Sequence, residues 1–226
     1  MMKNAVLIIS IPIIFLSDLL FADIILIPAD YPTIQEGINA ANEGDTVLVS
    51  PGTYAENIIW PVVNGIKLIG EDRNTTIIDG NQSGSVIYFH DSTIDTSTLV
   101  SNFTIKNGSS SKGGGIYCFE SEPSLMNLLV SENSTSEYGG GIYCRFSDPV
   151  LVNVVISENS SSYGGGIYCS GSDPNLGNVT IKNNLASYGG GLYCITNSSP
   201  RCLPFVSTNS TPLDPSASKR KIFPPS

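Results

Sequence analysis

Apolar residues recur along this chain with a long, regular period. The hexapeptide Gly-Gly-Gly-Ile-Tyr-Cys begins at Gly113, Gly139 and Gly164, and Gly-Gly-Gly-Leu-Tyr-Cys begins at Gly189. Successive copies therefore start 26, 25 and 25 residues apart. A fixed period of this length is typical of a solenoid, in which each repeat forms one coil and packs only on its neighbours.

Within one period, apolar and polar residues alternate over three short runs. In the repeat that starts at Gly139 these runs are residues 141–144, 150–153 and 154–157. Alternation of this kind predicts β-strands, and the gaps between runs leave no room for crossover helices. The sequence therefore predicts an all-β fold, a single-stranded right-handed parallel β-helix whose equivalent residues stack about 4.8 Å apart.

The segment before the regular repeats has the pattern of a cap. Residues 24–27 form a short apolar run that predicts an edge strand. Thr33 followed by Glu36 is a capping box, so we expect a short amphipathic helix over residues 33–43 that Gly44 ends. We assign residues 23–45 to an N-terminal cap and residues 46–200 to coils. Further strands are predicted at residues 46–50, 57–60, 65–70, 75–79 and 85–89.

One charged residue decides which side chains of the repeat point into the solenoid. Arg145 follows Cys144, so its position faces outward, and alternation then places Tyr143 outward and Ile142 inward with Cys144. The same assignment gives an inward column (Cys118, Cys144, Cys169 and Cys194) and an outward column (Tyr117, Tyr143, Tyr168 and Tyr193). On the third run, the positions predicted to point inward are Leu128, Val154, Val179, Val130, Ile156 and Ile181.

Asparagines form two further columns. The first comprises Asn102, Asn127, Asn153 and Asn178, each next to an inward apolar residue. Alternation forbids that arrangement unless the chain bends there, and asparagine tolerates the left-handed conformation that a bend requires. We expect this column to be a buried ladder at a corner. The second column, Asn133, Asn159 and Asn184, precedes the glycines.

Composition and the N-terminal segment bear on where the protein works. Hydrophobic residues make up 41% of the 226 residues, and the formal net charge is −9. The hydrophobic share allows a continuous core, and an acidic surface argues against a nucleic-acid partner. Lys3, an apolar run over residues 5–16 and the small Ala22 predict a signal peptide over residues 1–22, with an uncleaved anchor as the alternative. After cleavage we expect no membrane span.

Two stretches resemble known proteins. The stretch from Ile27 to Ile58, IPADYPTIQEGINAANEGDTVLVSPGTYAENI, resembles the start of secreted pectin lyase-like β-helix proteins, pectin methylesterases among them. The pattern Val130, Asn133, Gly139, which recurs at Ile156 and Ile181, resembles the repeats of polymorphic outer-membrane proteins. The resemblance extends from Ile24 to about Pro200. It implies the fold but no single activity, because such proteins include lyases, hydrolases, esterases and non-catalytic adhesins.

The cysteines and glycines are interpreted as structural. Cysteines in a line about 4.8 Å apart cannot surround a tetrahedral zinc ion, so we expect a buried ladder of reduced thiols, with one or two disulfides as the alternative. Cys202 lies outside the repeat. The glycine triplets lack the Lys-Ser/Thr of a phosphate loop, and tight turns with close stacking of coils explain them.

Two columns are candidates for binding. The outward tyrosines (Tyr117, Tyr143, Tyr168 and Tyr193) offer a platform for sugar rings, and a stabilising cross-strand ladder is the alternative. The acidic column of Glu122, Asp148 and Asp173 is a candidate site for Ca²⁺, against the alternative of a solvated acidic edge.

Catalytic motifs are not recognisable. The single histidine, His90, is expected at the surface, and Lys106 and Lys182 are isolated. The paired aspartate motifs that resemblance to pectin methylesterases would imply are missing, as is the Gly-His-Gly motif of polygalacturonases. We therefore assign no catalytic residue and expect no cofactor apart from Ca²⁺.

The C-terminal residues 201–226 are predicted to be a disordered or aberrant tail, because proline and serine replace the repeat pattern. We interpret the chain as a fragment or as carrying a frameshifted end, and an uncapped last coil invites self-association. The predicted function is that of a non-catalytic protein, secreted, extracellular or on the cell surface or outer membrane, which contacts glycans or cell-surface proteins in adhesion. The alternatives are a carbohydrate-active enzyme of the same fold and a fragment of an autotransporter passenger.

Overall fold

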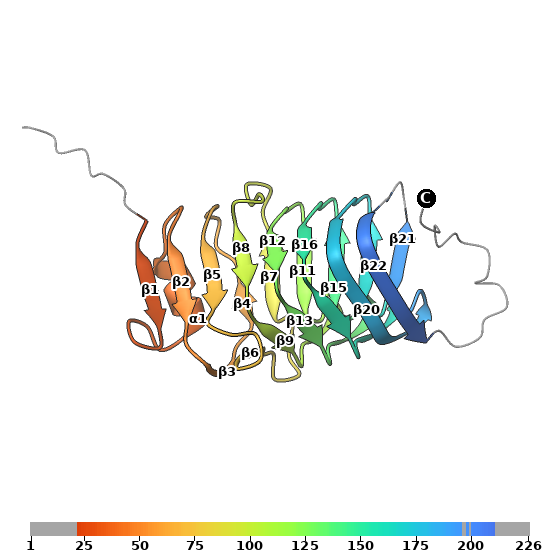
Figure 1. The fold of residues 1–226 in the computed structure, drawn as a ribbon, viewed down its shortest axis with the longest axis horizontal. Helices are drawn as coiled ribbons and strands as arrows, with labels where there is room; N and C mark the ends of the chain where they lie inside the picture. The colour runs from red at the N-terminus through yellow and green to blue at the C-terminus, as the bar shows by residue number, and fades with distance from the viewer. Residues whose placement is uncertain (1–21, 196–197, 199, 211–226) are drawn as a thin grey trace, which may run out of the picture.

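The structure is a computed structural model that describes residues 22–195, 198 and 200–210. In these residues one short helix precedes a rod of stacked β-coils (Figure 1). The predicted signal peptide, apart from Ala22, and residues 211–226 of the predicted tail lie outside the described residues. No helix in the described part of the chain has the length and apolarity that crossing a membrane requires.

Four rows of parallel strands run along the rod. Row 1 contains β1 (Ile24–Ile27), β2 (Thr46–Val49), β5 (Lys67–Gly70), β8 (Leu99–Ser101), β12 (Ser124–Met126), β16 (Val150–Val152) and the start of β20 (Asn175–Tyr188). Row 2 contains β3 (Gly52–Ala55), β6 (Thr76–Asp79), β9 (Thr104–Lys106), β13 (Leu129–Ser131), β17 (Val155–Ser157) and the middle of β20.

The other two rows return the chain to the start of the next coil. Row 3 contains β10 (Ser109–Lys112), β14 (Ser134–Tyr138), β18 (Ser160–Tyr163) and the end of β20. Row 4 is a separate six-stranded sheet of β4 (Ile58–Ile59), β7 (Ile87–His90), β11 (Ile116–Phe119), β15 (Ile142–Arg145), β19 (Ile167–Ser170) and β21 (Leu192–Ile195). The predicted parallel β-helix is confirmed, but the prediction of three strands per coil missed row 3. Its serine-rich segments lack the apolar alternation that marks a strand.

Equivalent residues of successive coils pair in register, as the repeat predicts. On row 4, Ile116 pairs with Ile142 and Ile142 with Ile167, and the cysteines pair in the same way. The inward assignment is confirmed, since Cys118, Cys144 and Cys169 have no more than a trace of exposure. All six apolar residues assigned inward on the third run are also buried.

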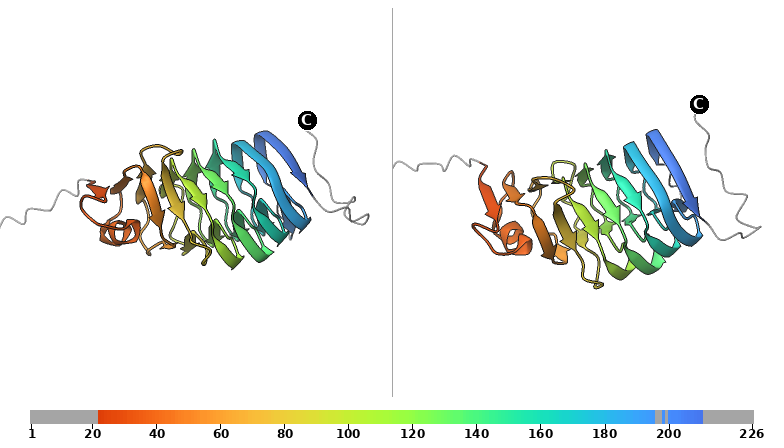
Figure 2. Two further views of the ribbon diagram at one scale, coloured as in Figure 1. Left: turned by 90° about the horizontal axis from the view of Figure 1, so that it is seen from below. Right: turned by 60° about the horizontal axis from the view of Figure 1, so that its bottom comes forward.

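The N-terminal helix α1 (Ile34–Ala40) covers the end of the core (Figure 2). Its predicted cap is confirmed, because the Thr33 hydroxyl accepts a hydrogen bond from the Glu36 N–H at 3.2 Å. The helix ends three residues earlier than predicted. Ala41 is extended, and the Asp45 carboxylate accepts from the Asn42 N–H, so the chain leaves the helix before Gly44 is reached.

The first asparagine column lies at the surface of the solenoid and not, as we predicted for it, in the core. Asn127, Asn153 and Asn178 adopt the expected left-handed conformation, with φ of 51°, 56° and 53°, but their side chains are exposed. The prediction that this column is buried is wrong, because the bend turns each amide outward. Asn102, the first member of the column, is half-buried. The amides still pair across coils, from Asn127 to Asn102 and from Asn178 to Asn153, both at 2.7 Å.

The second column is the buried ladder. Asn133, Asn159 and Asn184 are at most 1% exposed. The Asn133 amide donates to Asn159 Oδ1 at 3.0 Å, and the Asn159 amide donates to Asn184 Oδ1 at 2.9 Å. Each Oδ1 also accepts a backbone N–H from the preceding coil, so the ladder joins coils at a point where row 2 passes into row 3.

The structure also corrects the boundary of the predicted tail. The last strand, β22 (Arg201–Ser210), pairs in parallel with β20 over nearly its whole length. Cys202 pairs with Leu176 and so occupies a regular position of the repeat. The backbone of residues 201–210 therefore adds to the solenoid although its sequence has lost the repeat pattern.

Candidate binding face on the six-stranded sheet

An inner row of tyrosines runs along the outside of row 4. It contains the four predicted residues and one more, Tyr88, which pairs with Tyr117. Successive ring centroids lie 4.6, 5.0, 5.4 and 5.9 Å apart from Tyr88 to Tyr193, and neighbouring planes differ by at most 18°. The Ile-Tyr-Phe sequence at residues 87–89, which resembles Ile-Tyr-Cys, is the signal that would have identified Tyr88.

The inner row is not a solvent-facing platform, which corrects the expectation for Tyr117, Tyr143, Tyr168 and Tyr193. These rings lie outside the solenoid core, but Tyr143 and Tyr168 are only 3% and 5% exposed, and Tyr117 and Tyr193 are half-buried. A second layer of tyrosines lies against them. Tyr138 approaches Tyr168 at 4.7 Å between centroids, and Tyr163 approaches Tyr193 at 5.4 Å.

That second layer, the outer row, consists of Tyr138, Tyr163 and Tyr188, which come from the end of row 3. Their centroids are 5.5 and 4.9 Å apart, and the planes of Tyr163 and Tyr188 differ by 9°. Because the rings stack on one another along the rod, their faces are largely occupied by neighbours. What the outer row offers to a ligand is a line of ring edges and phenol groups, one per coil.

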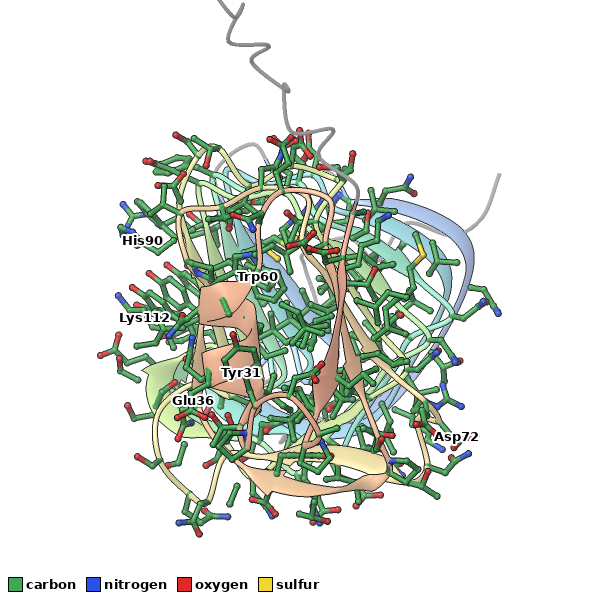
Figure 3. All side chains as sticks on the ribbon, turned by 90° about the vertical axis from the view of Figure 1, so that its left-hand side faces the viewer. Tyr31, Glu36, Trp60, Asp72, His90 and Lys112 are labelled. Carbon is green, nitrogen blue, oxygen red and sulfur yellow. The ribbon has the colours of Figure 1, made fainter. Side chains whose placement is uncertain are left out.

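Further aromatic and cationic groups flank the inner row. On one side the Lys112 ammonium lies 5.7 Å from the Tyr138 centroid. On the other side His90 stacks on Phe119 at 5.0 Å, and the Arg145 guanidinium lies 5.2 Å from the ring of the exposed Phe146. Figure 3 shows His90 and Lys112 projecting from the same side of the rod. His90 is exposed, as predicted.

Three tyrosines of the inner row, Tyr117, Tyr143 and Tyr168, hold their protons more tightly than free tyrosine does. Burial, followed by the charges of neighbouring tyrosines, raises the pKa of Tyr117 and of Tyr168 to about 12. Burial also raises the pKa of Tyr143. These phenols therefore remain neutral hydrogen-bond donors at any physiological pH.

This retention of protons predicts a loss of stability in alkali. The tyrosines of the unfolded chain ionise near 10, below the folded pKa of about 12 for Tyr117 and Tyr168. Their contribution to the free energy of unfolding is therefore complete below about pH 10 and is lost as the pH rises from about 10 to about 12. Urea unfolding across this range, with absorbance at the tyrosinate band, measures it. A Tyr117→Phe/Tyr168→Phe variant should lose less stability over the same range, and an equal loss would contradict the prediction.

The acidic column does not assemble into a compact ion site in the described residues. Glu122, Asp148 and Asp173 are exposed, and the Asp173 N–H donates to Asp148 Oδ1 at 2.6 Å. No group of three or more histidine, cysteine or acidic side chains in the described part of the chain is arranged to hold a metal ion. Glu122 instead lines a shallow hollow of about 320 Å³ with Asp95, Glu120 and Phe146.

The cysteines Cys118, Cys144, Cys169 and Cys194 are free in this structure. Contact with the neighbouring Cys144 thiol, together with burial, raises the pKa of Cys118 well above its usual value. A buried neutral thiol behaves as a small apolar residue, so Cys118 contributes packing rather than reactivity.

The two lysines considered for catalysis lie apart on row 2. Lys106 on β9 approaches the Asp79 carboxylate at 4.0 Å, and Lys182 lies three strands further along the row. Neither is brought to the tyrosine rows.

Comparison with protein families is consistent with this architecture. The family model described as "Right handed beta helix region" matches residues 36–206. No curated protein and no solved structure matches the chain.

Proposed function

The chain belongs to the right-handed β-helix family, and we propose that it is a non-catalytic extracellular protein that contacts carbohydrate through the outer tyrosine row. The observation that carries the proposal is the arrangement of Tyr138, Tyr163 and Tyr188, one phenol per coil at centroid spacings of 5.5 and 4.9 Å. The fold alone does not specify an activity, because function resides in sites that a fold carries.

The spacing suits an extended polysaccharide that lies along the rod. Adjacent strands of the solenoid lie about 4.8 Å apart, and we expect the sugars of an extended chain to repeat at a similar distance. One sugar can therefore meet one phenol in each coil, with sugar hydroxyls bonding to the tyrosine hydroxyls and ring edges packing beside them. Because the ring faces are stacked on neighbouring tyrosines, this mode replaces the stacking of sugars on ring faces that the sequence suggested.

The outer row is also held in place before a ligand arrives. Tyr138 and Tyr163 rest on Tyr168 and Tyr193, and each pairs with its neighbour in the row. Side chains that are already ordered lose little conformational entropy on binding, which raises the affinity of an otherwise flat surface. A flat, rigid face without a deep pocket is suited to holding a polymer.

The expected location supports a polysaccharide ligand. The first 22 residues have the pattern of a signal peptide, and the net charge of −9 disfavours nucleic acids. We therefore place the protein outside the cell or at the cell surface, where glycans and other surface proteins are its candidate partners in adhesion.

Binding to a panel of neutral and acidic oligosaccharides tests the proposal. The wild type is expected to bind at least one extended glycan, and a Tyr163→Phe/Tyr188→Phe variant should bind it more weakly while keeping the ring stack. Each lost hydroxyl contact costs about 1 kcal/mol, roughly fivefold in affinity. Tyr31→Phe is the matched control, since Tyr31 is 36% exposed and precedes the helix at the N-terminal end of the rod.

Three outcomes would count against the proposal. Equal binding by the wild type and the double variant would remove the outer row from the site. A wild type that binds no member of the panel would remove carbohydrate contact altogether. Reproducible product from an acidic polysaccharide would overturn the non-catalytic assignment.

A further inference from the structure

A second surface, the outer face of row 1, is apolar along most of the rod. Leu26, Leu48 and Ile69 pair in register on β1, β2 and β5, and Met126 and Val152 continue the same line on β12 and β16. Leu26 and Met126 are 42% and 36% exposed, and the other three are half-buried. The remaining positions of the line are the uncharged Ser101 and Gly177.

The neighbouring outward line on the same strands mixes apolar and polar residues. Ile24, which is 64% exposed, and the half-buried Leu99 and Val150 lie on it with Thr46, the buried Ser124 and the exposed Asn175. Lys67 is the one charged residue among the outward positions of the described row 1 strands from β1 to β20. An outer surface of this length with only one charged residue is unusual in a protein whose net charge is strongly negative.

Each of these strands except β20 carries at least one apolar residue on its outer face, although the solenoid core covers only the inner face. Parallel sheets are usually covered on both faces, and strands without a polar face are the sequence sign of that burial. Figure 1 shows row 1 facing the viewer, with none of the described elements crossing it. Helix α1 does not cover it, because Ile34 and Ile38 pack into the core at the end of the rod.

We propose that a second copy of this chain packs on this face, so that two rods lie side by side through their row 1 sheets. A two-fold axis brings identical lines of side chains together with the same coil spacing, so the ridges of one copy meet the grooves of the other. The same axis keeps the single Lys67 of each copy near the rim of the face or opposite an uncharged position. A partner of opposite charge is not favoured by a face that carries so little charge.

The area fits a weak and reversible dimer. Seven strands span six spacings of about 4.8 Å, or roughly 29 Å, and three to four residues per strand span roughly 10–13 Å. The face therefore covers roughly 300–400 Å² in projection. That is below the area of about 800 Å² per partner found in stable complexes, and we expect a dissociation constant of roughly 10–1,000 µM.

The charge of the protein predicts how the dimer responds to salt. Two copies with a net charge of −9 repel each other, and the contact itself contains no ion pair that salt would weaken. Raising the ionic strength should therefore strengthen the dimer. The opposite response would mean that charged groups, and not the apolar face, hold the copies together.

Sedimentation velocity over a concentration series in the stated range tests the proposal on the full mature chain. The wild type is expected to show a monomer–dimer equilibrium, which Met126→Lys/Val152→Lys should weaken at least tenfold. Both changes lie on the outer face, where Lys67 already occurs on β5 of the same row, so the coil should remain folded. Leu185→Lys is the matched control, because Leu185 is 52% exposed but belongs to row 3.

Other results would overturn the proposal. A wild type that remains monomeric throughout the series excludes the dimer, and unchanged association in the double lysine variant excludes this face. Oligomers that grow beyond the dimer indicate end-to-end addition at the last coil, which is the self-association that the sequence suggested. Circular dichroism of each variant confirms that a lost dimer does not reflect a lost fold.

Discussion

The Gly140→Ala variant is expected to lose most or all of the stability of the regular coils. A Cβ at this position would lie 2.5 Å from the Ser160 carbonyl oxygen and 2.6 Å from that of Gly165. Both oxygens belong to the backbone of the next coil, so neither can move without separating the coils. We expect a loss of more than about 4 kcal/mol, a large part of the 5–15 kcal/mol that typically stabilises a domain.

Thermal and urea unfolding, followed by circular dichroism, measure this effect. Gly52→Ala is the control, because its Cβ would meet only the Tyr54 ring, at 3.3 Å, and a ring can shift. A glycine-to-alanine change without backbone strain alters stability by no more than about 1 kcal/mol. If Gly140→Ala unfolds at the same urea concentration as the wild type, the explanation of the glycine triplets by close stacking of coils is wrong.

After Gly140→Ala, the Asn159→Ala variant should lose the most stability of the proposed variants. The Asn159 side chain donates to the Val130 carbonyl at 2.9 Å and to Asn184 Oδ1, and its Oδ1 accepts from the backbone and the amide of Asn133. Truncation leaves several of these groups without a partner in a site that is 1% exposed. Buried groups that lose a partner each cost about 1–3 kcal/mol, so a total of about 3–5 kcal/mol is expected.

An exposed asparagine provides the contrast. Asn153→Gly removes the 2.7 Å bond with Asn178 but keeps the left-handed backbone available, since glycine adopts it freely. We expect this variant to lose no more than about 1 kcal/mol. Equal losses at positions 153 and 159 in urea unfolding would show that the buried ladder has no special role.

The architecture of the coils was predictable because it depends on a periodic pattern. Repetition of Ile142 and Cys144 at one spacing indicates the stacking, and Arg145 beside them indicates which way the strand faces. The cap was predictable in part, since the Thr33 side chain bonds locally to Glu36. The end of the helix depends on Asp45, which accepts from the nearby Asn42 N–H and also from the distant Asp23 N–H, and the second contact leaves no local signal.

Burial across neighbouring rows could not be predicted in the same way. Alternation places Tyr143 outside the core, but it carries no information about Tyr138, Tyr163 and Tyr188, which arrive from row 3 and cover the inner row. The burial of the asparagine columns has a similar origin. Asn153 lies between two valines and Asn159 lies between Glu158 and Ser160, yet the direction of each corner turns the Asn159 amide inward and the Asn153 amide outward.

The dependence of affinity on oligosaccharide length measures sugar contact along the outer tyrosine row. If one sugar meets one phenol of Tyr138, Tyr163 and Tyr188, affinity for the extended glycan that binds best should rise with each added sugar until all three phenols are engaged. In the Tyr163→Phe/Tyr188→Phe variant, calorimetry should find that this rise is largely lost. Affinity that does not depend on length, or a rise that persists unchanged in the variant, would contradict the account.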